Sequence, residues 1–189
     1  YDLCVRPDHQ VTPDNVGTAL PEVTHLLRQE GVEVPMVTGN FDLLGPDHPT
    51  AEPILRAMEA ANIRFLKLGY FVFDPEQQDY WAEVDRARRL LEAWEAPARR
   101  HGVCVCYHTH SHGCLGVNCA ALMHLLQDRD PECLGAYLDT NAIGVRVGSD
   151  LDAPVRAQVQ GIARHMEDRL TKRHPMSDDH YPWRTGPYR

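Results

Sequence analysis

Three histidines gather in one short segment of the chain. In the run Tyr107-His108-Thr109-His110-Ser111-His112 the imidazoles occupy alternate positions, so they share one face if a strand continues through them. Neutral imidazole is a good ligand for divalent metal ions. The alternative is that histidines at a strand end are only surface or hydrogen-bonded groups. Three of them so close together favour a metal or substrate role, and His108 is the strongest candidate.

A carboxylate follows the next predicted strand along the chain. Asp139 comes directly after the apolar run 134–138, where a carboxylate is costly unless it has a partner or a metal ion. The alternative is that Asp139 caps a following helix. The carboxyl ends of neighbouring parallel strands carry the working residues in such folds. We therefore expect His108 and Asp139 to face one shared point.

A lysine inside an apolar strand is a further candidate. Lys67 has the same parity as Phe65 and Gly69 in the run 65–70. It either reaches into the site or extends its charged end to an edge of the sheet, and the residues alone leave both open.

These side chains need a scaffold in which strands alternate with helices. Strands are expected to begin near residues 1, 34, 65, 103 and 134, at spacings of 31 to 38 residues. Apolar residues at helical spacing lie between them, and predict helices from about Thr12, over 50–61 and over 79–96. Gly31 is placed to end the first of these helices, and Pro97 to end or kink the third. We expect Trp81 and Trp94 to lie in the core.

Consecutive strands joined by helices imply a parallel sheet. The fold class is thus α/β, and two architectures fit: a partial (β/α)8 TIM barrel of about five βα units, or a five-stranded doubly wound sheet. The predicted domain covers residues 1–151. In residues 152–189 we expect one helix and then an irregular tail.

Composition narrows the class of protein. The 189 residues are 43% hydrophobic and 24% charged, with a formal net charge of −8. This composition is typical of a globular protein. The negative net charge argues against nucleic acid as a partner. No apolar run approaches the ~18 residues of a membrane span, and no signal-peptide pattern opens the chain. The six scattered cysteines indicate free thiols of a cytoplasmic protein. Because the chain opens without Met, in what reads as a strand, we expect residues to be missing upstream.

At these residues the chain resembles the sugar phosphate isomerase/epimerase superfamily, whose fold is the xylose isomerase-like TIM barrel. The order and spacing of the matching segments agree with the second to sixth βα units of that family, and the resemblance covers about residues 1–145. The matching segments are 1–5, 49–55, 64–70, 107–111 and 134–140.

The resemblance implies a divalent metal ion, Mn, Mg, Co or Zn, held by acidic and histidine ligands at strand ends. Such an ion polarises the carbonyl of a sugar, and acid–base residues move a proton at the neighbouring carbon. By position, Asp139 matches an aspartate ligand, His108 stands where many members carry a glutamate ligand, and His110 matches a histidine two residues later. We therefore predict His108 and Asp139 as metal ligands, and His110 and Lys67 as catalytic residues.

The expected function is a metal-dependent sugar or sugar-phosphate isomerase or epimerase that acts on a small carbohydrate. One departure is that Asp139-Thr140-Asn141-Ala142 stands where the family often reads Asp-x-Gly-His. The alternatives are a related polyol dehydratase, or a non-catalytic α/β domain with a histidine cluster. Open sheet edges favour self-association. Neither nucleic acid nor membrane is an expected partner.

Overall fold

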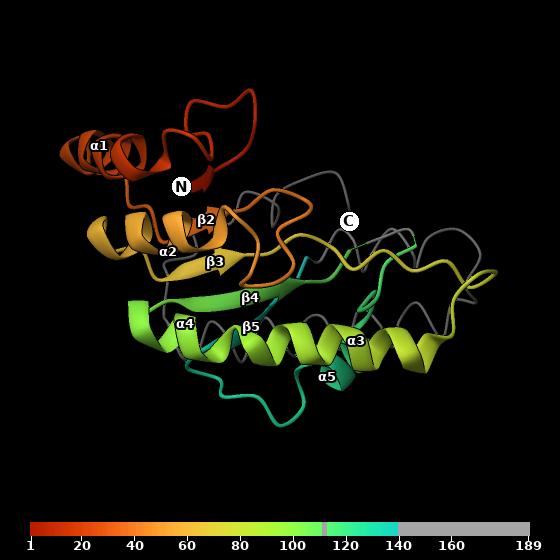
Figure 1. Ribbon diagram of the computed structural model, residues 1–189. Coiled ribbons are helices and arrows are strands. Elements are labelled where there is room, and N and C mark those ends of the chain that lie inside the picture. Colours follow the sequence, from red (N-terminus) through yellow and green to blue (C-terminus); the bar gives the residue numbers. More distant parts are fainter. Residues whose placement is uncertain (111–112, 140–189) are drawn as a thin grey trace, which may run out of the picture. The chain divides into compact units, whose positions relative to one another are not determined.

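The computed structural model describes residues 1–110 and 113–139, which form a parallel five-stranded sheet with helices between the strands (Figure 1). The expected helix and tail of residues 152–189 lie outside the described residues. The strands are β1 (Asp2–Cys4), β2 (Met36–Thr38), β3 (Phe65–Lys67), β4 (Cys104–His108) and β5 (Leu134–Tyr137).

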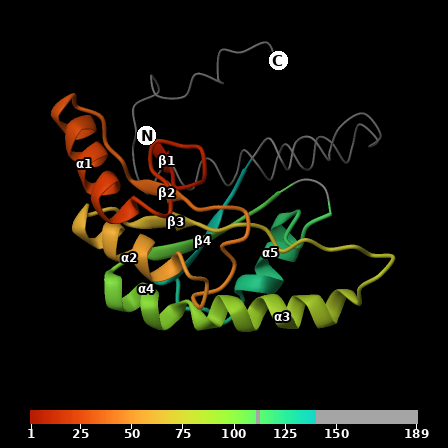
Figure 2. The same cartoon turned by 45° about the horizontal axis from the view of Figure 1, so that its top comes forward.

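The order of the strands decides between the two predicted architectures. The strands pair in sequence order, β1-β2-β3-β4-β5, and every pair is parallel. A doubly wound sheet reverses direction at a switch point and carries helices on both faces. Here the helices lie along one side of a curved sheet (Figure 2), so the doubly wound alternative is wrong and the partial barrel is confirmed.

The register of the strands separates an apolar face from a polar one. One row across the sheet consists of buried apolar side chains that face the helices. This row is Leu3, Val37, Leu66, Val105 and Leu134. The next row, one residue further along, points to the opposite face and is small or polar. This row is Cys4, Thr38, Lys67, Cys106 and Gly135. The side chain period of two in a strand produces this division.

Five helices cover the apolar face. They are α1 (Val16–Gln29), α2 (Ala51–Ala60), α3 (Tyr80–Ala93), α4 (Glu95–His101) and α5 (Cys119–Leu126). Helix α1 begins later than Thr12 because the Asn15 side chain accepts the Thr12 backbone N–H at 2.7 Å and closes a turn there. The expectation for its end is correct, since Gly31 adopts a φ of 75° directly after the helix cap.

The predicted third helix is interrupted close to Pro97, where an end or a kink was expected, but the interruption lies at Trp94 and a second helix follows it. Helix α3 stops before Trp94, and Pro97 lies in the first turn of α4, where its missing N–H leaves no hydrogen bond unmade. Trp94 is fully buried and its indole N–H donates to the Leu44 carbonyl at 3.0 Å. Trp81, by contrast, is 58% exposed, so its predicted core position is wrong.

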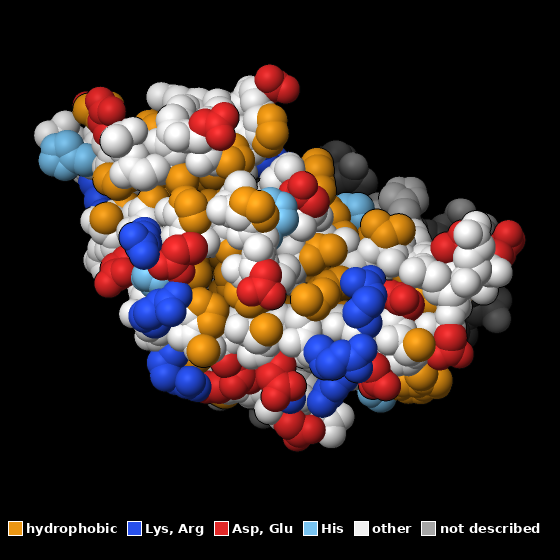
Figure 3. Space-filling view, viewed as in Figure 1, with side chains coloured by type: hydrophobic (Ala, Val, Ile, Leu, Met, Phe, Trp, Pro, Cys, Tyr) orange, Lys and Arg blue, Asp and Glu red, His pale blue; other side chains and the backbone are white. Residues whose placement is uncertain are grey.

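Acidic and basic side chains are interspersed over the surface formed by the helices (Figure 3). Ion pairs between these side chains connect neighbouring helices in addition to the apolar contacts. Glu52 on α2 accepts from Arg56 of the same helix at 2.8 Å and from Arg100 on α4 at 2.7 Å.

All six cysteines are free thiols, as expected. Among the described helices, none combines the length and apolar character that crossing a membrane requires.

The loops that follow β3 and β4 are tied to each other. Phe73 N–H donates to the Gly113 carbonyl at 2.7 Å, and Leu115 N–H donates to the Phe71 carbonyl at 2.9 Å. The buried hydroxyl of Tyr107 completes the junction, because it accepts the Phe71 N–H at 3.2 Å and donates to the Leu115 carbonyl at 3.0 Å.

The Tyr107→Phe substitution tests this junction. It removes only the hydroxyl, and so leaves a buried N–H and a buried carbonyl without that partner, at a cost of about 1–3 kcal/mol. Urea unfolding should show this loss, while Tyr1→Phe, at a position 70% exposed, should leave stability unchanged. Equal midpoints for the two variants would contradict the proposed bracing of the loops.

Candidate active site

The candidate site is built on the polar face of the sheet, at the carboxyl ends of the strands. His108 lies opposite Tyr137 in the register of β4 and β5, and the pairing continues past both strand ends. Thr109 N–H donates to the Tyr137 carbonyl at 3.0 Å, and the Thr109 hydroxyl accepts the Asp139 N–H at 3.0 Å. This extension holds Asp139 next to His108.

The structure therefore brings together the two residues predicted as metal ligands. His108 Nε2 lies 3.4 Å from Asp139 Oδ2. The His108 side chain is 3% exposed, whereas the Asp139 side chain is 35% exposed. The pair thus has a buried nitrogen donor and a carboxylate that solvent or a ligand can reach.

Burial keeps the His108 imidazole neutral. Desolvation, with the nearby positive charge of Lys67, lowers the pKa of His108 to about 4, although Asp139 acts in the opposite direction. The buried Nδ1 has no hydrogen-bond partner among the described residues. Burying a polar nitrogen without a hydrogen-bond partner costs free energy. Neutral imidazole is the protonation state of histidine that binds metal ions.

The pair fits part of a divalent metal site. Two ligand atoms bound to one tetrahedral ion at about 2.1 Å stand roughly 3.4 Å apart, close to the spacing seen here. Within residues 1–110 and 113–139, no group of three His, Cys, Asp or Glu side chains is arranged to hold a metal ion. The described part of the chain thus offers two ligands, and a complete shell needs further donors.

Lys67 reaches the interior rather than an edge of the sheet. Its ammonium nitrogen lies 4.8 Å from the centre of the Tyr137 ring. Burial lowers the pKa of Lys67, and the positive charge of Arg6 acts in the same direction, while Asp2 and Asp139 oppose them. Lys67 therefore faces the same region as the predicted metal ligands.

His110 joins the cluster through an aromatic neighbour that the sequence did not single out. Its ring centre lies 4.0 Å from that of Tyr70 and 5.6 Å from that of His108. Tyr137 also packs against His108, with ring centres 4.9 Å apart. Tyr70 and Tyr137 could have been found from the sequence only by their positions at strand ends and by the alternation of side chains along the strands. His112, the third histidine of the run, lies outside the described residues.

A glycine fixes the neighbouring loop against this cluster. A Cβ at Gly69 would stand 1.9 Å from the Phe41 carbonyl oxygen, so only glycine permits this approach. Gly69 N–H donates to the Leu43 carbonyl at 3.0 Å and Tyr70 N–H to the Phe41 carbonyl at 3.2 Å. The loop after β2 is thereby held over the end of β3, with the Phe41 ring stacked on Tyr70 at 5.6 Å.

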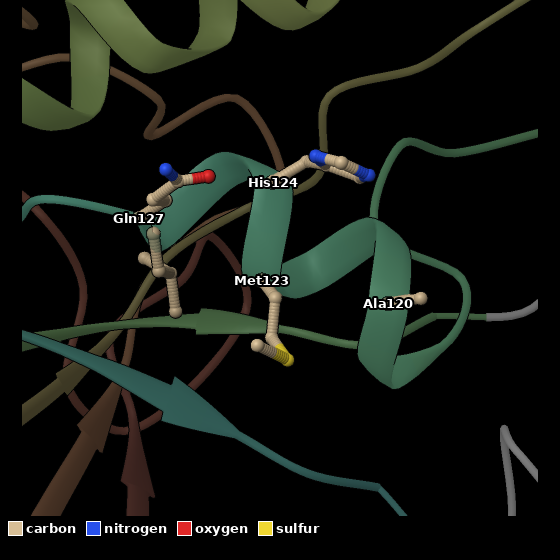
Figure 4. A pocket seen from close by; sticks show the side chains of 5 residues that line it. Ala120, Met123, His124 and Gln127 are labelled. Atoms are coloured by element: carbon tan, nitrogen blue, oxygen red, sulfur yellow. The ribbon is translucent and has the colours of Figure 1, made fainter.

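A shallow apolar depression on α5 shares no residue with this cluster (Figure 4). Its lining residues come from one helix and the residue that follows it. They are Ala120, Met123, His124, Leu126 and Gln127. Convergent acid–base groups, which a catalytic pocket needs, are found on the polar face of the sheet instead.

The shifted pKa of His108 predicts a pH dependence of folding. Below about pH 6.5 the His108 imidazole of the unfolded chain binds a proton, whereas in the folded chain the same imidazole stays neutral down to about pH 4. Unfolding is therefore favoured as the pH falls through this window, by on the order of 1–3 kcal/mol. Denaturant unfolding between pH 7 and pH 4 measures the effect.

The control is the same titration with His108→Gln and with His25→Gln, which lies at an exposed position of α1. His108→Gln should lose this part of the pH dependence and His25→Gln should keep it. A His108→Gln curve parallel to that of the wild type would contradict the burial argument.

Comparison with known proteins rests on structure alone. No family model and no curated protein matches the chain. Solved structures do match, among them 3-keto-D-glucoside 4-epimerase from E. coli, with a TM-score of 0.60 and 15% identity over 82% of this chain and 64% of that one. A D-tagatose 3-epimerase-like protein matches with a TM-score of 0.56 and 18% identity, over 73% of this chain and 55% of that one.

A third match is the probable 3-DHS dehydratase of petrobactin synthesis from Bacillus anthracis, with a TM-score of 0.51 and 15% identity over 77% of this chain and 64% of that one. This chain thus spans between about half and two thirds of each of these proteins. At such identities the likeness concerns the fold, and it agrees with the strand order and register described above. The described part of the chain thus has the fold of the corresponding part of the xylose isomerase-like TIM barrels.

Proposed function

We propose that this chain forms part of a metal-dependent carbohydrate isomerase or epimerase, and that its substrate is a sugar or sugar phosphate. The observation that carries the proposal is the contact of 3.4 Å between His108 Nε2 and Asp139 Oδ2 at the carboxyl ends of β4 and β5. Solved structures of the same fold include sugar epimerases, which supports carbohydrate as the substrate class.

In this proposal His108 and Asp139 hold the divalent ion, Mn, Mg, Co or Zn. A bound divalent ion would polarise the substrate carbonyl and so acidify the neighbouring C–H group. The neutral state of His108 suits the role of ligand, since protonated imidazole binds no metal. Donors beyond this pair complete the shell.

His110 and Lys67 are the proposed acid–base residues. The His110 imidazole is half-buried beside Tyr70, and in this role it takes the proton from the carbon next to the carbonyl and returns it. The Lys67 ammonium donates a hydrogen bond to the carbonyl oxygen as negative charge develops there. The lowered pKa of Lys67 brings this donor nearer to the range in which it also transfers a proton.

A second candidate is a dehydratase, favoured by the likeness to the probable 3-DHS dehydratase. Abstraction of a proton next to a carbonyl is the first step in both reactions. They part afterwards, because a dehydratase then expels a hydroxyl group as water, whereas an epimerase or isomerase returns the proton.

Metal binding tests the proposed ligands. His108→Gln and Asp139→Asn should each weaken Co²⁺ binding by at least about 100-fold, since even residues behind a ligand contribute 10–100-fold. Isothermal titration calorimetry measures the affinity. His124→Gln and Asp128→Asn, at exposed positions, are the matched controls and should bind as the wild type does. Unchanged binding in both site variants would refute the proposed ligand pair.

Proton exchange tests the reaction. In D₂O with Mn²⁺, the chain should introduce deuterium at the carbon next to the carbonyl of a keto sugar, and His110→Gln should reduce the rate by about 100- to 10,000-fold. Mass spectrometry separates the two candidates, because a gain of one mass unit indicates an epimerase or isomerase and a loss of water a dehydratase. Metal binding without exchange or dehydration would favour a non-catalytic domain.

A further inference from the structure

Arg6 is a cation held in place without a carboxylate. It follows β1, in the same parity as Asp2 and Cys4. Its Nε–H donates to the Gly39 carbonyl at 3.1 Å, and its guanidinium lies 4.3 Å from the centre of the Phe41 ring. These contacts occupy one edge and one face of the group. The two terminal nitrogens have no hydrogen-bond or ion-pair partner among the described residues.

This state is unusual for an arginine of this chain. The sequence is acidic, with 27 Asp and Glu against 19 Lys and Arg. Eight other arginines of the described part lie within 4.0 Å of a carboxylate: Arg28, Arg56, Arg64, Arg86, Arg88, Arg99, Arg100 and Arg129. Arg89 forms no ion pair with a described residue either, but its side chain is exposed on the surface of α3. Carboxylates are thus abundant, and Arg6 is half-buried without contacting one.

A second cation faces the same region. Gly39 connects Arg6 and Lys67, because its carbonyl accepts the Arg6 Nε–H at 3.1 Å and its N–H donates to the Lys67 carbonyl at 2.9 Å. The positive charge of Arg6 also acts to lower the pKa of Lys67. The carboxylates that act on Lys67 are Asp2 and Asp139, and neither forms an ion pair with it. Asp2 accepts the Thr38 hydroxyl, and Asp139 lies against His108. Within residues 1–110 and 113–139, neither of these two cations forms an ion pair with a carboxylate.

We propose that Arg6, aided by Lys67, binds an anionic group of the carbohydrate substrate, either a phosphate or a carboxylate. The planar guanidinium presents paired N–H donors that match the oxygens of both groups. Its stack on Phe41 fixes the orientation of these donors in advance. Phe41 stacks on Tyr70 and Tyr70 on His110, so a row of rings leads from the anion to the proposed acid–base residue.

This inference rests on the proposed function for the identity of the ligand, but its test needs neither metal nor turnover. Binding of D-fructose 6-phosphate, D-glucuronate and D-fructose to the full chain is measured by calorimetry in EDTA. At least one anionic sugar should bind ten or more times as tightly as D-fructose. Preference for the first assigns a phosphate and preference for the second a carboxylate. Equal affinity for all three, or no binding of the anionic sugars, would overturn the inference.

Variants connect the preference to Arg6. Arg6→Gln should weaken binding of the preferred anionic sugar by about 10- to 100-fold and leave D-fructose unaffected, whereas Arg6→Lys should retain part of the preference. Arg56→Gln removes a surface arginine paired with Glu52 and is the matched control. If Arg6→Gln does not fold by circular dichroism, Lys67→Gln takes its place with the same expectation. An undiminished preference in the folded variant would overturn the inference.

The outcomes separate this inference from the proposed function. Anion preference that depends on Arg6, in a chain that binds no divalent ion at His108 and Asp139, would support the anion site and refute the isomerase. Metal binding and proton exchange with no preference for anionic sugars would support the isomerase and refute the anion site.

Discussion

The register of the five parallel strands is the constraint on which the site depends. One row of residues across the sheet is apolar and buried under the helices, and the row beside it is small or polar. A slip of one residue in any strand would exchange the two rows, and would turn His108 towards the helices. The hydrophobic effect that selects the apolar row, roughly 1.5–3 kcal/mol for each buried side chain, thereby also orients the polar residues.

The polar face holds ionisable groups against an energetic cost. Burial depresses the pKa of His108 and of Lys67, which means that each resists its charged form. Aromatic rings lie next to both groups, since Tyr137 packs against His108 and against Lys67. Because the charged forms of these side chains are destabilised in the free protein, the site is suited to bind a ligand whose charge is opposite to theirs.

Much of this architecture follows from the sequence, because the period of apolar residues specifies it. The strand starts, the end of α1 at Gly31 and the meeting of His108 with Asp139 all depend on local pattern and strand order. The exposure of Trp81 could not be predicted, since its helical spacing alone does not tell the core side from solvent. Pro97 indicated an interruption of the helix but not its position, because proline is also tolerated in the first turn of a following helix.

The cluster of Arg6, Phe41 and Tyr70 was beyond sequence reasoning for a different reason. Phe41 follows Arg6 by 35 positions and Tyr70 follows it by 64, and the contacts between the three residues depend on the path of the loop after β2. That path is held by backbone hydrogen bonds, such as that from Tyr70 N–H to the Phe41 carbonyl, which any residue type makes. Periodicity carries no signal for such contacts.

The close approach at Gly69 has a consequence for the evolvability of the site. Because the Phe41 carbonyl occupies the space of a side chain at position 69, that position is closed to variation. Phe41 itself is 55% exposed, although its ring contacts Tyr70 and Arg6. New substrate preferences can therefore arise by mutation at position 41 on an invariant backbone, and libraries for directed evolution of this scaffold should diversify Phe41 and leave Gly69 untouched.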